Sequence, residues 1–387
     1  MRRKIYELCG LLAVIACAAA LVGFPKEAVQ AASDGLQLCL NVIVPSLFPF
    51  FVISNLAVEL GLAARIGRGI EPAMRRLFNV SGACASAFVL GFVGGYPVGA
   101  RTAISLYERG ECSRREAERL LSFCNNSGPA FILGVVGAGV FADNRVGLLL
   151  YLVHGLASVI VGLCFRGWKS GSDVRRAPKP KEQASRAGFA EAFTSSVKSA
   201  FASSLNICGF VIFFTVIIKM MFISGILPLL SEAISVVLAP IGMDEEMSTR
   251  LITGIIELSS GVWSLSDAAG SLSTGAAMAA FMLGWAGISV HCQTLSFLCD
   301  SGLSGRTYII GKLMHGVISA ALVWLAFCII PFEEAAAAYL ARQVSGIASM
   351  DFVGSLAISA VCAGVLAGFM LLFAGITEKR LEKERKI

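Results

Sequence analysis

Charged side chains are scarce in this sequence. Only 15% of its 387 residues are Asp, Glu, Lys or Arg, whereas about a quarter of the residues in a soluble domain are charged. Hydrophobic residues make up 56% of the chain, and the mean hydropathy is +0.76. The composition therefore excludes an ordinary soluble domain. It predicts an all-α polytopic membrane protein, because helices satisfy their own backbone hydrogen bonds in lipid.

The motifs of several enzyme classes are also missing. The chain has no nucleotide-binding P-loop, no HExxH zinc motif and no GxSxG nucleophile motif. Its 12 cysteines form no CxxC pair. Several lie inside apolar runs, where they are expected to pack as small apolar side chains, among them Cys9, Cys17, Cys164, Cys208, Cys328 and Cys362. The sequence therefore predicts neither an enzyme nor a metal or disulfide framework, and no cofactor is expected.

Ten hydrophobic runs reach the length needed to cross a bilayer. They span residues 5–24, 42–63, 82–105, 118–142, 145–166, 205–224, 247–270, 274–298, 306–330 and 352–376. If all ten crossed, the basic clusters on either side of 82–105 would lie on opposite faces, which conflicts with the positive-inside rule. A re-entrant hairpin over 82–105 removes the conflict, and 247–270 is its expected counterpart. The sequence thus predicts about eight crossings and two hairpins.

The distribution of basic residues supports this topology, with both termini cytoplasmic. Of the 32 Lys and Arg residues, 25 fall in segments predicted to be cytoplasmic. The N-terminal run follows Arg2, Arg3 and Lys4, so it also resembles a secretory signal. Because the run is long enough to span, we expect it to be a retained first helix.

The two halves of the chain carry similar segments. Residues 41–51 resemble 206–215, the break at 94–97 aligns with 257–261, and the break at 125–129 aligns with 290–294. Three crossings plus a hairpin in each copy would invert the second copy relative to the first. The expected divisions are an N-terminal transmembrane helix (1–25), a first repeat (26–166), a cytoplasmic linker (167–188), an inverted second repeat (189–330) and a final part with an outer-surface segment, the last helix and a basic tail (331–387).

Four interruptions of the apolar runs are the candidate site. Broken helices at bilayer depth expose free amides and carbonyls, which can hold an anion or a cation. The candidate substrate-binding residues come from these four interruptions: Gly94, Gly95, Tyr96, Pro97, Asn125, Asn126, Ser127, Gly128, Glu257, Ser259, Ser260, His291, Gln293 and Thr294.

Two titratable residues in these interruptions have a functional interpretation. Glu257 is an acid deep in a predicted membrane segment, where an unpaired carboxylate costs a few kcal/mol. It is expected to bind a coupling cation, carry a proton or meet the solute, and the alternative is a structural ion pair with Arg101 or Lys312. His291 is expected to hydrogen-bond a solute or gate a proton, and the alternative is a helix–helix hydrogen bond.

The remaining basic groups within the apolar runs have simpler interpretations. Lys312 and His315 are three residues apart on one helical face. An anion contact is one interpretation, but snorkelling of the lysine to the membrane surface is the favoured explanation. For His154 and His315, which lack a counterpart in the other repeat, ordinary packing is expected.

Several of these stretches resemble the sporulation integral membrane proteins of the YlbJ type. The similar segments are 41–51, 94–100, 122–129, 257–258, 287–293 and 312–316. The resemblance places the chain in the Gate, or nucleoside-recognition, group, which is similar to concentrative nucleoside transporters and the membrane part of ferrous-iron transporters. It implies a role in endospore formation and movement of dipicolinic acid across the outer forespore membrane. One departure is Ser259-Ser260, where a Glu-Leu-Thr-Asn-Gly-like stretch is expected.

Three functions remain open from the sequence. The first is a secondary transporter of a small anionic or heteroaromatic solute, coupled to Na⁺ or H⁺ or to neither. The second is a nucleoside or divalent-cation carrier of the same fold, and the third is a membrane scaffold for spore assembly. The expected partners are the solute, the bilayer of a bacterial cell membrane and, if the protein is a homo-oligomer, a second copy of the chain. The basic linker is assigned to topology or lipid contact, so no nucleic acid is expected.

Overall fold

The computed structural model describes residues 2–60, 62–168, 188–267, 271–299 and 301–330, and every regular element within these ranges is helical. This confirms the predicted all-α class. Most of the predicted linker, the expected surface segment and the last apolar run lie outside the described residues.

Within the described residues, five helical segments are long and apolar enough to span a membrane: Pro25–Ala57, Asn144–Gly167, Phe189–Ile223, Leu272–Cys299 and Arg306–Ile329. A sixth arises if the pair Gly69–Phe78 and Gly82–Gly94, which bends by 110°, is counted as one span. The figure of eight crossings stays a prediction, because the last apolar run lies outside the described residues.

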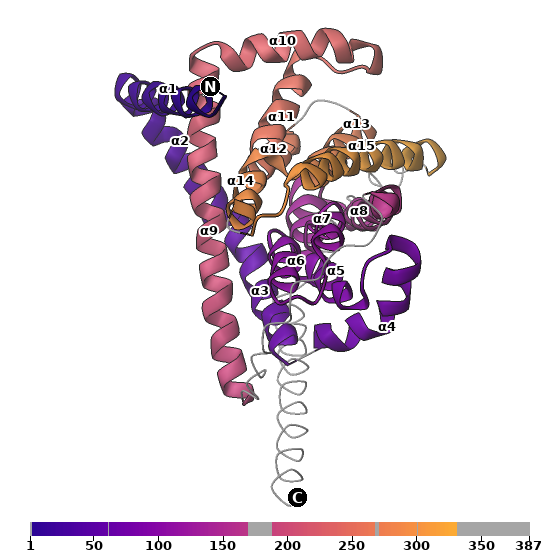
Figure 1. Ribbon diagram of the computed structural model, residues 1–387. Helices are drawn as coiled ribbons and strands as arrows, with labels where there is room; N and C mark the ends of the chain where they lie inside the picture. Colours follow the sequence, from indigo (N-terminus) through magenta and orange to yellow (C-terminus); the bar gives the residue numbers. More distant parts are fainter. Residues whose placement is uncertain (1, 61, 169–187, 268–270, 300, 331–387) are drawn as a thin grey trace, which may run out of the picture.

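The first half contains one long, continuous helical segment after its first helix, followed by shorter, interrupted helices. Its elements are α1 (Arg2–Gly23), α2 (Pro25–Leu38), η1 (Cys39–Ile43), α3 (Val44–Glu59), α4 (Leu62–Phe78), η2 (Gly82–Cys84), α5 (Ala85–Gly94), α6 (Val98–Glu108), α7 (Arg114–Leu121), η3 (Ala130–Val140), α8 (Asn144–Cys164) and η4 (Phe165–Gly167). Elements α2, η1 and α3 follow one another without a break and form one long rod, which runs beside a second long rod, helix α9 (Phe189–Ile223) of the other half (Figure 1).

The second half opens with that long helix and then repeats the interrupted pattern. Its elements are α9 (Phe189–Ile223), α10 (Ile226–Leu238), η5 (Ala239–Ile241), α11 (Glu245–Ile256), α12 (Leu258–Trp263), η6 (Ser264–Asp267), α13 (Leu272–Trp285), α14 (Gly287–Cys299) and α15 (Arg306–Ile329). Helix α10 runs across the end of α9 (Figure 1), and α13 packs along α15.

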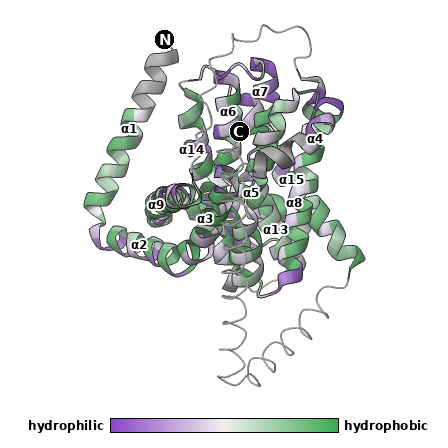
Figure 2. Ribbon diagram, turned by 90° about the horizontal axis from the view of Figure 1, so that it is seen from below, coloured by the Kyte–Doolittle hydropathy of each residue, from purple (hydrophilic) through white to green (hydrophobic). Residues whose placement is uncertain are grey.

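The outer helices present apolar side chains to their surroundings. On α8, Leu148, Leu152 and Leu156 are all exposed and lie four residues apart, so they form one stripe. Figure 2 shows mostly hydrophobic residues on α8 and α13, whereas α4 and α7 carry more hydrophilic ones. An exposed apolar stripe of this kind fits contact with lipid, as the composition predicts.

Both predicted hairpins are present as pairs of helices that fold back on each other. An ideal Cβ on Gly99 of α6 would lie 2.9 Å from the Cα of Gly91 on α5. In a continuous helix, residues eight apart are separated by about 12 Å. An ideal Cβ on Gly261 would likewise lie 2.1 Å from the Cα of Gly254. Each hairpin therefore closes through a pair of glycines, and re-entry of the hairpins from the membrane faces stays a prediction.

Candidate functional site

A small cavity lies where the two hairpin tips meet the helix interruptions. Its volume is about 60 Å³. Half of the predicted site residues line it: Gly95, Tyr96, Ser127, Gly128, Glu257, Ser259 and Gln293. The tips of the first and second hairpins thus reach the same point, as the sequence predicts.

Aromatic residues that the sequence did not single out close the rest of the cavity. Phe50 and Phe51 come from α3, Phe131 from η3 and Phe210 from α9. Ser289 of α14 adds a hydroxyl to the polar side. The cavity therefore combines a polar wall at the tips with an apolar wall from the two long rods.

The cavity has room for little more than water. A water molecule needs roughly 10–15 Å³ of such volume, so about 60 Å³ holds a few waters. Any solute with an aromatic ring is larger, so its binding requires the tips and the rods to move apart.

Glu257 lies between α11 and α12 and caps the second of these helices. Its carboxylate accepts hydrogen bonds from the backbone N–H of Ser259 (3.1 Å) and of Ser260 (2.6 Å), and from the hydroxyl of Ser289 (3.4 Å). These donors explain how a buried carboxylate is held at a helix N-terminus. Among the described residues no cation forms an ion pair with it, so the alternative of a pair with Arg101 or Lys312 is wrong.

The predicted interruption at 289–294 lies earlier in the chain. Helix α13 ends at Trp285 and α14 begins at Gly287, so residues 289–294 are helical. Ala286 and Gly287 have φ values of 81° and 80°, which is the backbone conformation that ends one helix and turns the chain into the next. The side chains of Ser289 and Gln293 still reach the cavity from the first turns of α14.

Asn125 and Asn126 occupy the predicted interruption between α7 and η3 but do not line the cavity. Asn125 donates to the hydroxyl of Thr294 (3.2 Å) and accepts from the amide of Ala100. The amide of Asn126 donates to the carbonyl of Phe123 (2.9 Å) and to the hydroxyl of Ser158 on α8 (3.3 Å). Both asparagines are completely buried, and they hold the interruption in place.

The other predicted residues lie around the cavity. Gly94 ends α5 and Pro97 precedes α6, so both belong to the first tip without lining the cavity. Ser260 shares a hydrogen bond with the hydroxyl of Thr215 on α9 (3.1 Å). His291 is buried with its ring between Trp285 and Tyr308, at centroid distances of 4.3 and 5.2 Å.

Comparisons with known proteins identify the family. Residues 40–143, which contain the first hairpin and the first interruption, match the Gate family, described as nucleoside recognition. The chain is 30% identical over 323 residues to the sporulation integral membrane protein YlbJ of Bacillus subtilis (strain 168), and the match covers 79% of each chain. The chain belongs to the YlbJ family.

Solved structures of a concentrative nucleoside transporter, CNTnw, share the fold of this YlbJ-family chain. CNTnw in an inward-facing substrate-bound state aligns with a TM-score of 0.56 and 15% identity, over 84% of this chain and 86% of the other. A variant in an outward-facing state aligns with a TM-score of 0.53 and 14% identity, over the same shares. At this identity the likeness establishes the fold.

The YlbJ-family chain carries a buried lysine that the sequence interpretation missed. Lys312 of α15 is 0% exposed, so the expected snorkelling to the membrane surface is wrong. Its Nζ lies 3.0 Å from the hydroxyl of Tyr96, 3.0 Å from the carbonyl oxygen of Asn125 and 3.3 Å from Nδ1 of His315. The lysine therefore joins the first hairpin tip to the first interruption.

Two histidines extend these contacts and are more than packing residues. The backbone amide of Ser127 donates to Nε2 of His154 on α8 (3.1 Å), and Nε2 of His315 lies 2.9 Å from the carbonyl of His154. Their rings are 4.3 Å apart. Since Ser127 lines the cavity, the two histidines position part of its wall.

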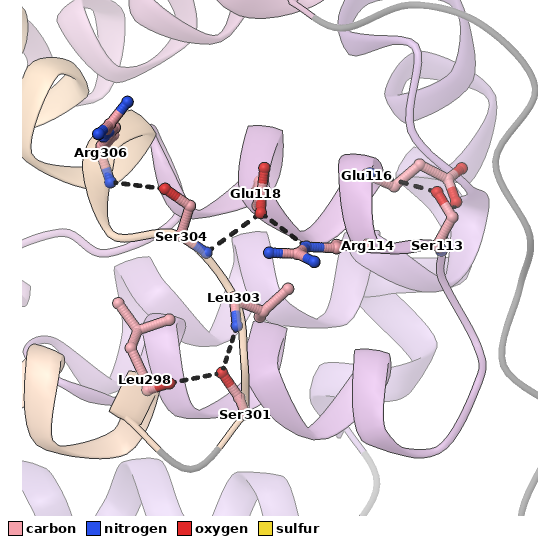
Figure 3. A network of polar contacts seen from close by, with 9 residues as sticks. All are labelled: Ser113, Arg114, Glu116, Glu118, Leu298, Ser301, Leu303, Ser304 and Arg306. Carbon is pink, nitrogen blue, oxygen red and sulfur yellow. Dashed lines mark hydrogen bonds and ion pairs between the residues drawn. The ribbon is translucent and has the colours of Figure 1, made fainter.

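Polar contacts at the start of α15 fix the helix that carries Lys312. Figure 3 shows the carboxylate of Glu118 on α7 between Arg114 and the backbone amide of Ser304. Oε1 of Glu118 lies 3.1 Å from both donors, and Glu118 is buried. These contacts join α7 of the first half to the loop before α15 in the second half.

Arg101 lies outside the cavity. It is exposed on α6, with its guanidinium 5.2 Å from the centre of the Phe297 ring. It lines a separate, open hollow of about 870 Å³ along the first hairpin, together with Arg109, Glu71 and Glu111. The mixed charges of this hollow do not select a solute of one sign.

Proposed function

We propose that this YlbJ-family protein is a secondary transporter of a small anionic or heteroaromatic solute, with dipicolinic acid as the first candidate. The observation that carries the proposal is the cavity shared by both hairpin tips, lined on one side by polar groups and on the other by phenylalanines. Transporter sites form where discontinuous helices of two repeats meet. The relationship to a sporulation protein of Bacillus subtilis supports a solute of endospore formation.

The proposal includes two inverted repeats, at 26–166 and 189–330, with both termini cytoplasmic. In support, each half contains a hairpin that closes through a glycine pair, Gly91 with Gly99 and Gly254 with Gly261. Each half also contains a long rod, and the two rods run side by side (Figure 1). Such repeats would place the cavity near the bilayer midplane, in the cell membrane or the outer forespore membrane.

The chemistry of the cavity suits a flat ring with polar substituents. Phe51 and Phe210 line the cavity, and stacking of a flat ring on a phenylalanine adds about 0.5–1.5 kcal/mol beyond the burial of area. A carboxylate in the cavity can accept hydrogen bonds from the side chains of Gln293 and Ser259 and from the backbone N–H at Gly95. The positive charge of Lys312 lies directly behind Tyr96, so this side of the cavity favours a negative group.

The alternatives receive less support from the same residues. A divalent-cation carrier needs converging acidic, histidine or cysteine ligands, and no group of three such side chains gathers within the described residues. A scaffold has no use for a polar cavity between hairpin tips. A nucleoside carrier fits the fold, because CNTnw shares it, and it differs from the proposal in the solute.

Uptake into proteoliposomes tests the proposal directly. Purified full-length protein would be assayed with labelled dipicolinate, nucleosides and ferrous iron, with protein-free liposomes as the control. We expect saturable uptake of dipicolinate that unlabelled dipicolinate inhibits. Saturable uptake of a nucleoside instead would establish the second function, and no saturable uptake of any solute by correctly folded protein would favour the scaffold.

A further inference from the structure

The nitrogen of Lys312 is surrounded by groups that can only accept hydrogen bonds from it. The carbonyl of Asn125 has no hydrogen to give. The hydroxyl of Tyr96 donates its hydrogen to a backbone carbonyl of α13 (2.7 Å), so it accepts from the lysine. Nε2 of His315 faces a backbone carbonyl of α8 and must carry the ring hydrogen, so Nδ1 accepts. A neutral amine has two hydrogens, and three acceptors require the three hydrogens of an ammonium.

Among the residues that the structure describes, no carboxylate balances this buried charge. The titratable groups near Lys312 on the surrounding elements are Tyr96 of the first hairpin tip, Cys124 of the interruption, His154 of α8, His291 of α14, and Tyr308 and His315 of α15 itself. Helix α13, which packs along α15, has no ionisable side chain. Within the described residues the ammonium is held by a carbonyl, a hydroxyl, an imidazole and the face of the Tyr96 ring, 5.0 Å from its centre.

A carbonyl freed by a helix interruption, beside a hairpin tip, is the type of group that binds a coupling cation in transporters with broken helices. In this protein the positive charge beside the carbonyl of Asn125 is the ammonium of Lys312 and not a bound ion. A charge held inside a membrane protein without a partner is costly, and its default interpretation is functional.

We propose that the Lys312 ammonium is a resident cation. It occupies the space between the Tyr96 hydroxyl and the carbonyl of Asn125 where a coupling cation would otherwise bind, so no sodium ion binds there and transport does not require sodium. The proposal deepens the proposed transport function by assigning its cation site. Its first test needs no solute, so the two can fail separately.

The solute-free test measures the melting temperature of the full-length protein in detergent, in sodium chloride and in choline chloride at equal ionic strength. We expect the parent protein to melt at the same temperature in both salts. Lys312→Ala empties the position and leaves its acceptors, so we expect a lower melting temperature that sodium, but not choline, raises by about 2–4 °C. If this variant does not fold, Lys312→Ser serves the same purpose with a hydroxyl beside Tyr96.

Lys219→Ala is the matched control. Lys219 is also a lysine in a spanning helix, but it is exposed on α9 and lies near the Phe222 ring. We expect its melting temperature to be the same in both salts. A parent protein that sodium stabilises, or a folded Lys312→Ala protein that responds to sodium no more than Lys219→Ala, would overturn the proposal.

The second test uses proteoliposomes with dipicolinate as the probe. We expect the initial rate of uptake by the parent protein to be unchanged when sodium is replaced by choline on both sides. A fall of tenfold or more without sodium would overturn the resident-cation proposal while supporting transport. Absence of dipicolinate uptake in both salts would count against the proposed solute, and the melting experiment would then decide the resident-cation proposal by itself.

Discussion

Replacement of Glu257 by glutamine tests whether this residue acts only as the N-cap of α12 or also takes part in transport. The carboxylate accepts the N–H groups of Ser259 and Ser260, at 3.1 and 2.6 Å, and it lines the cavity. Glutamine keeps one acceptor oxygen and turns the other into an NH₂ group that faces a backbone donor. One hydrogen bond to a charged acceptor is lost, and such bonds contribute about 1.5–3 kcal/mol. We therefore expect Glu257→Gln to be less stable by about 1–3 kcal/mol.

Asp244 provides a control from the same hairpin. It caps α11 by accepting the backbone N–H of Met247 (2.8 Å), and it does not line the cavity. Loss of an N-cap costs about 0.5–2 kcal/mol, so Asp244→Ala should be destabilised to a similar extent. A difference in transport between the two variants then reports on the cavity and not on the stability of the hairpin.

The assays are thermal unfolding of the purified variants and uptake of dipicolinate over a range of pH. We expect Asp244→Ala to transport like the parent protein once the amounts of folded protein are equal. Glu257→Gln should change the dependence of dipicolinate uptake on pH, because a glutamine side chain does not gain or lose a proton over the pH range of the assay. If both variants keep the parental profile and rate, Glu257 is a cap only and the functional interpretation of this residue is refuted.

Three further changes test the hairpin, the topology and the apolar wall. An ideal Cβ on Gly99 lies 2.0 Å from a carbonyl oxygen of the first interruption, so Gly99→Ala should cost about 1–3 kcal/mol by overpacking; Gly209→Ala, with open space around it, should be neutral in the same thermal unfolding assay. Cysteines replacing the exposed Arg76 and Arg109, on either side of the first hairpin, should both be labelled from the cytoplasm only, in a background without other reactive cysteines; labelling from opposite faces would make 82–105 a crossing. Phe210→Ala should weaken competition by dipicolinate about tenfold, and competition by an aliphatic dicarboxylate much less; equal losses would argue against stacking.

The sequence predicted the hairpin tips because the chain itself enforces them. Glycine and proline at 94–97 cannot continue a regular helix, and the structure ends α5 at Gly94 and starts α6 at Val98. The interruption at 125–129 contains Asn-Asn-Ser-Gly-Pro, and its residues 125–128 are non-helical for the same reason. Breaks of this kind can be predicted from the sequence, because the glycine, proline and asparagine residues that cause them lie at the break itself.

The interruption predicted at 289–294 was misplaced because its signal is not local. Ala286 adopts a positive φ although alanine favours a helix, so tertiary packing decides the position of the break. The Ser289–Thr294 stretch was selected by alignment of the two halves, and its polar residues sit in a helix whose first turns face the cavity.

The role of Lys312 was missed because its partners are distant in the sequence. Its acceptors at Tyr96 and Asn125 are 216 and 187 residues away. Only the packing of α15 against the first hairpin and the first interruption brings them together. From the sequence, a lysine in an apolar run is more often one that reaches the membrane surface.

Each hairpin closes through a pair of glycines, but the two tips have opposite charges. An ammonium lies behind the first tip, at Tyr96, and a carboxylate lies in the second, at Glu257. For a carboxylate solute, the first tip is attractive and the second repulsive, so the negative group should face Tyr96 and the ring should lie against the phenylalanines. Each of these two effects depends on one charge, that of Lys312 or that of Glu257, and can be removed by replacing that residue. We therefore expect Lys312→Gln to weaken dipicolinate binding and Glu257→Gln to strengthen it, as measured by competition for uptake at a pH where each variant is folded. If both variants shift the affinity in the same direction, the two tips do not impose opposite preferences on the solute.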